Sequence, residues 1–359
     1  MKGLFRIGDL SPEEVELLME TAEDMAAFPE KYREACRGKK LATLFFEPST
    51  RTRLSFESAM LELGGSVLGF SSANSSSASK GESVTDTART VGCYADVIAM
   101  RHPEEGAPMA AAVAAGVPVI NAGDGGHEHP TQTLADLLTI HRRMGRLSNM
   151  TVGLCGDLKY GRTVHSLLAA LMRYENIRVV LISPPELRLP GYVKREMDKA
   201  QTLSYEETEC LEGALPELDI LYMTRIQRER FEDPEEYERL KGSYILTPEK
   251  MRAGKPTLSV LHPLPRVDEI SPEVDEDKRA AYFEQVANGK LMRQALILRL
   301  LDLLPTAPTP AALLSDGAAM TGVRCTNRRC VTEDLRIPAR FQIPEDGKVR
   351  CLYCDAVAR

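Results

Sequence analysis

With 359 residues, 43% of them hydrophobic and 27% charged, the sequence is typical of a globular protein and is long enough for two domains with their own cores and a small additional unit. The formal net charge of −7 argues against a general nucleic-acid-binding surface, so arginines that gather around one site would serve a local purpose. We expect a cytoplasmic protein without a membrane-spanning segment, because no apolar run is long enough to cross a bilayer and the N-terminus leads directly into amphipathic sequence.

The first part of the chain alternates between amphipathic helices and short apolar strands. Ser11-Pro12-Glu13-Glu14 predicts a helix start, with Ser11 as the N-cap and Glu14 completing a capping box. Beyond it we expect helices that end at Leu63, span 82–94 and lie near 109–115, separated by strands at 41–46, 66–70, 97–100 and 117–121. This order favours a parallel sheet with helices on both faces.

The second part repeats the pattern after a long amphipathic helix that opens at 129–132. Its expected strands are 151–155, 178–183, 219–223, 243–246 and 258–262, with a helix over 162–174 after the first and a last long helix at 285–304. The sequence therefore predicts an α/β fold with two doubly wound parallel-sheet domains joined by long helices.

Ser49-Thr50-Arg51-Thr52 stands where the first strand gives way to a helix. Ser49 is placed as the N-cap, so the backbone N–H groups of residues 49–52 would lie at the positive end of a helix dipole. Such a turn can hold an anion, most simply a phosphate. An ordinary capped helix is the alternative, and this stretch alone does not distinguish the two.

Polar and basic residues follow the other predicted strands, at the ends where ligands bind in open parallel sheets. They are Arg101, His102, His129 and Gln132 in the first part, and Arg162, Arg225, Gln227 and the run His262-Pro263-Leu264-Pro265-Arg266 in the second. Each arginine taken singly could be a solvated or ion-paired surface residue. Together, in a chain of negative charge, they indicate a ligand set with several negative groups.

The serine-rich stretch 71–83 ends in Lys80-Gly81-Glu82. Its composition is typical of a flexible polar loop, and a mobile loop that carries a lysine could also close over a phosphate. Spacing does not decide whether such a lid would cover the site of its own chain or that of a neighbour.

Five strings in order resemble the catalytic chain of the aspartate carbamoyltransferase family, and the resemblance runs from the first helix to about Leu304. The strings are Phe46-Glu47-Pro48-Ser49-Thr50-Arg51-Thr52-Arg53, Met100-Arg101-His102-Pro103, His129-Pro130-Thr131-Gln132, Asp157-Leu158-Lys159-Tyr160-Gly161-Arg162-Thr163-Val164-His165 and Leu261-His262-Pro263-Leu264-Pro265-Arg266. The resemblance implies transfer of the carbamoyl group of carbamoyl phosphate to the amine of L-aspartate, in de novo pyrimidine biosynthesis. It also implies that residues 1–135, with the return helix 285–304, bind carbamoyl phosphate and that residues 136–284 bind aspartate.

The same resemblance assigns roles to individual residues. Those implied to bind carbamoyl phosphate are Ser49, Thr50, Arg51, Thr52, Ser76, Arg101, His129, Gln132, Pro263 and Leu264, and those implied to bind aspartate are Lys80, Arg162, Arg225 and Gln227. Thr50, Arg51, Lys80, Arg101 and His129 would be the catalytic groups, with no cofactor needed for the transfer. Forked guanidinium groups suit the two carboxylates of aspartate better than lysine does. Ser79 stands where many relatives have a second lysine, which leaves the loop one charge weaker.

In the family, residues matching Ser76 and Lys80 enter the site of a neighbouring subunit, so the resemblance implies a homotrimer with shared active sites. The implied partners are the two substrates and further copies of the chain, with neither a nucleic acid nor a membrane. No general base for the aspartate amine is evident in the sequence, and the resemblance suggests that the leaving phosphate takes the proton.

Four cysteines form two pairs near the C-terminus, Cys325 with Cys330 and Cys351 with Cys354. The proline-containing segment 305–322 separates them from the last helix and predicts an extended linker. Four thiolates at this spacing suit a structural, tetrahedral Zn²⁺ site in a small β domain at 323–359. A pair of disulfides is the alternative, although nothing indicates an oxidising compartment.

The cysteine pattern resembles the zinc domain of the family's separate regulatory chain, without the nucleotide-binding domain that normally precedes it. The chain is therefore interpreted as a fusion protein, whose zinc domain would brace catalytic trimers or join them into a dimer of trimers. Two other interpretations remain open at this point. One is another carbamoyltransferase, for example one that acts on ornithine, and the other is a zinc-ribbon scaffold or binding protein without catalysis.

Overall fold

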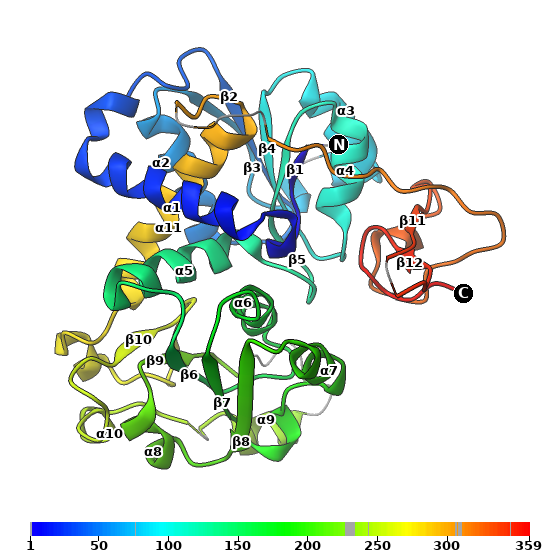
Figure 1. The fold of residues 1–359 in the computed structure, drawn as a ribbon. Helices are drawn as coiled ribbons and strands as arrows, with labels where there is room; N and C mark the ends of the chain where they lie inside the picture. The colour runs from blue at the N-terminus through cyan, green and yellow to red at the C-terminus, as the bar shows by residue number, and fades with distance from the viewer. Residues whose placement is uncertain are drawn as a thin grey trace. The chain divides into compact units, whose positions relative to one another are not determined.

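The computed structural model describes residues 2–75, 77–226, 234–242, 244–305, 307, 311–344 and 346–359. Contacts between Cα atoms divide the chain into two compact units, Met1–Thr131 with Lys290–Arg359 and Gln132–Gly289. We call them unit 1 and unit 2, and Figure 1 shows a parallel-sheet fold in each. In the part of the chain that the structure describes, no helix has both the length and the apolar character required to span a membrane.

Unit 1 contains a five-stranded sheet in the order β1-β5-β4-β2-β3, in which every pair is parallel. Helices α1 and α2 lie on one side of this sheet and α3 and α4 on the other (Figure 1). The strands are β1 (Gly3–Leu4), β2 (Lys40–Phe45), β3 (Ser66–Phe70), β4 (Val97–His102) and β5 (Val119–Asp124), and the helices are α1 (Pro12–Ala27), α2 (Thr50–Glu62), α3 (Val84–Gly92) and α4 (Ala107–Ala115). The predicted parallel sheet is confirmed, with the short edge strand β1 added.

The start of α1 forms as the sequence predicts. The hydroxyl of Ser11 accepts a hydrogen bond from the backbone N–H of Glu14, whose carboxylate accepts one from the N–H of Ser11. This reciprocal capping box satisfies two N–H groups that an α-helix leaves without partners. Val15, Leu18 and Ala22 then face the core.

Unit 2 contains a second five-stranded parallel sheet, in the order β10-β9-β6-β7-β8. Its strands are β6 (Met150–Cys155), β7 (Ile177–Ile182), β8 (Leu203–Thr208), β9 (Ile220–Met223) and β10 (Ser259–Leu261). Its helices are α6 (Arg162–Leu171), α7 (Gly191–Lys199), α8 (Leu211–Ala214), α9 (Pro234–Leu240) and α10 (Pro248–Met251). Helices α5 (Pro130–Met144) and α11 (Tyr282–Leu300) each contain residues of both units.

The strand predictions for unit 2 need two corrections. A strand was expected at 243–246, but its described residues, 244–246, form none. Leu246 instead makes an isolated parallel bridge to Ile270. Edge strand β8 was not predicted, because most of its side chains are polar and at least partly exposed, so its sequence lacks the apolar run of a buried strand.

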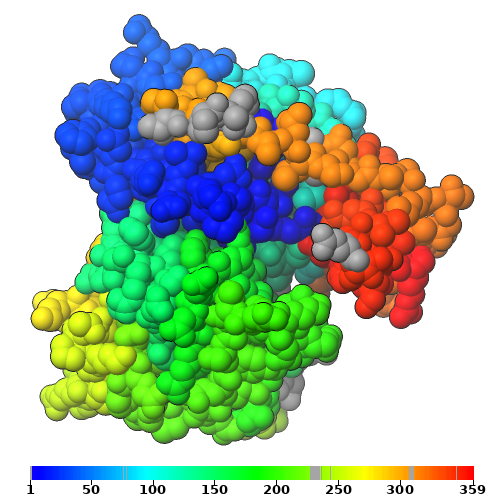
Figure 2. All heavy atoms as spheres, in the orientation of Figure 1, coloured from blue at the N-terminus to red at the C-terminus, as the bar shows by residue number. Residues whose placement is uncertain are grey.

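The C-terminal module, residues 323–359, belongs to unit 1 and contains a two-stranded antiparallel sheet of β11 (Phe341–Gln342) and β12 (Arg350–Cys351). Figure 2 shows its residues, in red, as a small body beside the other residues of unit 1. Buried side chains of the module, including Val331, Ile337, Leu352 and Tyr353, share one hydrophobic cluster with residues of β4, α3 and α4. A segment this short buries little core of its own, so this shared cluster contributes to its folding.

Candidate active site and metal centre

The turn between β2 and α2 adopts the helix start that the sequence predicts. Ser49 occupies the N-cap position with extended backbone angles (φ −155°, ψ 91°), but its hydroxyl makes no capping hydrogen bond. The first turn of the helix contains no acidic side chain, and Thr50 and Arg51 are exposed. The positive end of the helix dipole therefore carries three hydroxyl residues and an arginine, a combination that can bind an anion.

Arg101, near the end of β4, reaches toward the same turn. Its Nη2 donates a hydrogen bond to Glu47 Oε1 at 2.7 Å, and its side chain is 12% exposed. The Arg101 carbonyl accepts a hydrogen bond from the backbone N–H of Phe46 at 2.9 Å, which ties the end of β4 to the end of β2. An anion bound at the turn would compete with Glu47 for the guanidinium. The role of Glu47 was missed in the sequence, although it is the one acid in the basic string 46–53.

His129 is buried, at 5% exposure, at the end of the loop that joins β5 to α5. The preceding loop is held by Asp124, whose carboxylate accepts hydrogen bonds from the backbone N–H groups of Gly106 at 2.7 Å and Glu128 at 3.0 Å. Since β2, β4 and β5 are neighbours in the sheet, the turn 49–52, Arg101 and His129 all follow the same edge of unit 1.

His127, in the loop before His129, lies between two carboxylates. Its Nδ1 is 3.0 Å from Asp124 Oδ2, and its Nε2 is 3.2 Å from Asp355 Oδ2 of the C-terminal module. Burial alone would lower the pKa of His127, but these carboxylates raise it well above its ordinary value. The charged imidazolium can then donate to both acids and hold the loop.

Lys80 ends a short 3-10 turn, Ser77–Lys80, and its side chain is exposed. Gly81 follows with φ +88°, a left-handed conformation that favours glycine. Ser76, a predicted carbamoyl phosphate ligand, lies outside the described residues.

In unit 2, the loop after β6 places Arg162 as the first residue of α6. The loop is tied to the end of β9, because the hydroxyl of Thr224 accepts a hydrogen bond from the N–H of Asp157 at 3.0 Å. The same hydroxyl donates to the carbonyl of Cys155 at 3.0 Å. Arg225 directly follows Thr224, so Arg162 and Arg225 follow adjacent strands that these bonds connect. Gln227 lies outside the described residues.

His165 supports the same loop from inside α6. Its Nε2 donates to the carbonyl of Leu158 at 2.8 Å, and burial lowers its pKa, so the neutral ring is favoured. We therefore interpret His165 as a support for the loop rather than as a ligand.

The turn after β10 is organised by His262. Its Nδ1 accepts a hydrogen bond from the N–H of Leu264 at 2.7 Å, which leaves Nε2 to donate to Glu269 Oε1 at 2.7 Å. Burial alone would raise the pKa of Glu269, but the bond to His262 holds it below its ordinary value. Arg266, which the sequence groups with the other strand-end arginines, instead pairs with Asp275 at 2.6 Å.

A buried network links this turn to Gln132. The N–H of His262 donates to Gln285 Oε1 at 2.9 Å, and Gln285 Nε2 donates to Asp136 Oδ1 at 2.6 Å. Asp136 also accepts from Gln132 Nε2 at 2.8 Å and from the hydroxyl of Tyr222 at 3.0 Å. Asp136 and Gln285 were not predicted, although an acid in the apolar stripe of α5 is a recognisable signal.

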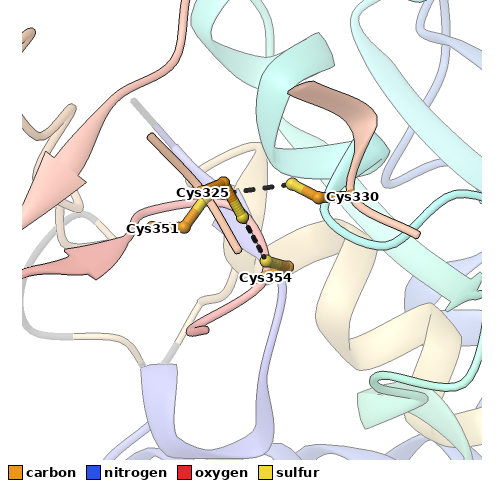
Figure 3. Close-up of side chains that lie close together, drawn as sticks. All are labelled: Cys325, Cys330, Cys351 and Cys354. Carbon is orange, nitrogen blue, oxygen red and sulfur yellow. Dashed lines mark hydrogen bonds between the residues drawn. The ribbon is translucent and has the colours of Figure 1, made fainter. Parts of the chain in front are cut away.

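The four cysteines of the C-terminal module converge (Figure 3), and their sulfur atoms all lie within 4.8 Å of one another. The Sγ atoms of Cys325 and Cys354 are 3.5 Å apart, and those of Cys330 and Cys351 are 3.8 Å apart. A disulfide would require about 2.05 Å. Tetrahedral metal–sulfur bonds of about 2.3 Å place sulfur atoms roughly 3.8 Å apart. The donor set therefore fits a structural metal ion.

Three family models match the chain. The model described as "Aspartate/ornithine carbamoyltransferase, carbamoyl-P binding domain" matches residues 2–142, and the one described as "Aspartate/ornithine carbamoyltransferase, Asp/Orn binding domain" matches residues 148–300. The third, "Aspartate carbamoyltransferase regulatory chain, metal binding domain", matches residues 320–359.

Similar proteins agree with these matches. The aspartate carbamoyltransferase catalytic subunit of Lachnoclostridium phytofermentans is 59% identical over 305 residues, which cover 85% of this chain and 99% of that protein. The corresponding subunit of Clostridium acetobutylicum is 57% identical over 296 residues, covering 82% and 96%.

Solved structures give the same result. The catalytic subunit of M. jannaschii aspartate transcarbamoylase has a TM-score of 0.78 at 46% identity and covers 84% of this chain and 98% of its own. Aspartate transcarbamoylase from Trypanosoma cruzi in complex with carbamoyl phosphate and aspartate has a TM-score of 0.78 at 39% identity, covering 82% and 95%.

Proposed function

Because the chain belongs to the aspartate carbamoyltransferase family, we propose that the strand ends of its two parallel sheets hold the two substrates of that reaction. The enzyme transfers the carbamoyl group of carbamoyl phosphate to the amine of L-aspartate and releases phosphate and N-carbamoyl-L-aspartate. The observation that carries the proposal is the position of the turn 49–52, Arg101 and His129 at the ends of three neighbouring strands.

We assign the phosphate of carbamoyl phosphate to the start of α2. The backbone N–H groups and hydroxyls of Ser49, Thr50 and Thr52 would surround it, and Arg51 and Lys80 would supply positive charge. Ser76 completes this assignment, although it lies outside the described residues. The absence of acidic side chains from the first turn of α2 supports it.

The carbamoyl group is assigned to the residues beside this turn. Arg101, His129 and Thr50 would donate to its carbonyl oxygen, where negative charge develops when the amine attacks. Gln132 and the backbone carbonyls of Pro263 and Leu264 would hold its amide. The network through Asp136 and Gln285 supports this pairing, because it ties Gln132 to the turn after β10.

Aspartate is assigned to Arg162 and Arg225, with Gln227 and Lys80. Two guanidinium groups on adjacent strand ends suit the two carboxylates of aspartate, whereas ornithine has only one carboxylate. Once both substrates are oriented, the amine attacks the carbonyl carbon, the carbon–oxygen bond to phosphate breaks, and the departing phosphate accepts the amine proton. Orientation and preorganised donors supply the rate enhancement.

The domain boundaries, the metal site and the assembly of the chain complete the proposal. Residues 1–135 with helix 285–304 form the carbamoyl phosphate-binding domain, 136–284 the aspartate-binding domain and 305–322 the linker. The module 323–359 would hold Zn²⁺ through Cys325, Cys330, Cys351 and Cys354, as the all-thiolate donor set favours. We further propose a fusion of a catalytic chain with a regulatory-type domain, a cytoplasmic homotrimer and a joining of trimers through the module.

The decisive experiment measures phosphate release from carbamoyl phosphate with L-aspartate or L-ornithine offered in parallel. We expect turnover with aspartate, and turnover with ornithine alone would overturn the proposal. Arg225→Gln should raise the aspartate KM by roughly 10-fold or more, the loss expected for a charge-assisted hydrogen bond. The matched control is Arg178→Gln, which removes an exposed arginine paired with Glu206 in the same unit and should leave both KM values unchanged.

A further inference from the structure

Within unit 1, the C-terminal module contacts three segments that follow β3, β4 and β5. The first contact is at Glu105, just beyond β4. The backbone N–H of Glu105 donates to the carbonyl of Arg329 at 2.9 Å, and its carbonyl accepts from the N–H of Val331 at 3.0 Å. Asn327 Nδ2 donates to Glu105 Oε2 at 2.6 Å. These bonds fix the module beside the strand that carries Arg101.

The second contact is with the loop 125–129, which ends at His129. Asp355 of the module lies 3.2 Å from His127 Nε2, and the opposite ring nitrogen is 3.0 Å from Asp124. Arg6 forms an ion pair with Asp355 and donates from Nη2 to the carbonyl of Leu352 at 2.7 Å. The charged groups around His127 therefore come from the module and from the N-terminal part of unit 1 together.

The third contact is with the segment that carries Lys80. Arg336 of the module donates from Nη1 to the carbonyl of Gly81 at 2.5 Å. Its guanidinium is oriented by Asp334, which accepts from Nε at 2.8 Å and from Nη2 at 2.6 Å. Gly81 directly follows Lys80, so this bond restrains the backbone next to the lysine.

Apolar packing accompanies these polar contacts. Ile337, next to Arg336, belongs to the same hydrophobic cluster as Val84, the first residue of α3 after the Lys80 segment. Gly106 approaches Tyr353 so closely that a Cβ at residue 106 would lie 2.4 Å from the Tyr353 Cβ. Close packing therefore fixes the position of the module, so its polar side chains are held beside the two loops.

We propose that Arg336 and Asp355 of the module are positioning residues for the reaction, Arg336 for the segment that carries Lys80 and Asp355, through His127, for the loop that carries His129. The inference rests on the proposed function, because that function gives Lys80 and His129 their roles. Its physical basis is preorganisation, since a loop that is already held in its binding conformation loses less entropy when substrate binds.

The test uses the full-length, metal-loaded protein with Arg336→Gln and Asp355→Asn. The controls are Arg340→Gln, which removes a bond to the carbonyl of Asp316, and Asp346→Asn, which removes an ion pair with Arg350 at 2.7 Å. Both controls change charged groups of the module that make contacts away from the two loops. Metal content is measured for every variant, so that loss of the ion is not mistaken for loss of positioning.

The first readout is hydrogen–deuterium exchange by mass spectrometry without substrates. Arg336→Gln should speed exchange in peptides that cover 77–83, and Asp355→Asn in peptides that cover 125–129, while the controls leave both unchanged. The second readout is kinetic. We expect the KM for carbamoyl phosphate to rise about 3- to 10-fold in both variants, in the range of one lost hydrogen bond, with a smaller change in kcat.

Unchanged exchange in both loops would overturn the inference, and so would faster exchange without any kinetic change. Lys80→Gln separates this failure from failure of the proposed function. If Lys80→Gln impairs the use of carbamoyl phosphate and Arg336→Gln does not, the positioning role is wrong while the function stands. If Lys80→Gln has no effect, the assigned role of Lys80 itself is wrong.

Discussion

His102 should make the protein less stable below neutral pH, and the size of the effect follows from its surroundings. It is the last residue of β4 and is 8% exposed, its ring centroid is 4.6 Å from that of Phe46, and its Nδ1 accepts a hydrogen bond from the N–H of Glu104 at 3.0 Å. Burial lowers the pKa of His102 from 6.5 to about 4, against the opposing effect of Asp124. The folded protein therefore keeps this ring neutral.

The sign of the effect follows from proton binding. Between about pH 6.5 and pH 4 the unfolded chain binds a proton at residue 102 and the folded protein does not, so the free energy of unfolding falls as pH falls through this window. The full pKa difference corresponds to about 3 kcal/mol, and the part lost between pH 7 and pH 5 is about 2 kcal/mol.

The perturbation is His102→Asn, which keeps an acceptor for the N–H of Glu104 and cannot titrate. Unfolding by urea at pH 7 and at pH 5, with metal content monitored, should show a loss on acidification that is about 2 kcal/mol smaller in the variant. Groups such as His127 titrate in both proteins and largely cancel in this difference. Exchange of the imidazole C2 hydrogen, followed by mass spectrometry, reports the pKa of His102 directly. A midpoint near 6.5, or equal losses in the two proteins, would refute the reasoning.

Two glycine substitutions test close approaches, one at the C-terminal module and one at the strand ends of unit 2. Gly116→Ala is the shared control, because Gly116 also has a left-handed φ of +69° but a Cβ there would meet no atom within 4 Å. Gly106→Ala would drive a Cβ into Tyr353 and should speed the loss of metal to a chelator more than 10-fold. A 10-fold change corresponds to roughly 1.4 kcal/mol. Equal rates of metal loss in Gly106→Ala and the control would contradict the close packing of the module at Gly106. Gly156→Ala would place its Cβ 2.5 Å from the carbonyl oxygen of Thr224, at the loop that precedes Arg162. In initial-rate assays the aspartate KM should therefore rise while the carbamoyl phosphate KM changes little. The reverse pattern would count against the assignment of aspartate to Arg162 and Arg225.

The sequence predicts features that depend on neighbours in the chain. The capping box of Ser11 and the helix start at Ser49 follow from a few consecutive residues, and the structure places both where the pattern indicates. The ends of the strands were predictable for the same reason, since an apolar run stops and a polar residue follows. Strand β8 was missed because an edge strand with mostly polar side chains has no such run.

The sequence does not predict partners that meet through the fold. Asp136 and Gln285 are 149 residues apart, and their hydrogen bond depends on how α5 and α11 pack within unit 2. Glu47 and Arg101 meet because β2 and β4 are paired, a register that their separate strings do not contain. Composition and spacing indicate which types of residue line the site. Which of them form hydrogen-bonded pairs depends on the order and register of the strands and on the packing of the helices.

The C-terminal module illustrates how covalent connection changes the energetics of such pairs. Single exposed hydrogen bonds, such as that from Arg336 to Gly81, contribute little when two separate chains must first associate. Here the module is part of the same chain as the residues that it contacts, which raises the effective concentration of the two partners. The shared hydrophobic cluster and a bound metal ion would then both contribute to the folding of so short a segment. Metal binding, folding of the module and restraint of the two loops are therefore expected to be thermodynamically coupled, so each of the three should strengthen the others.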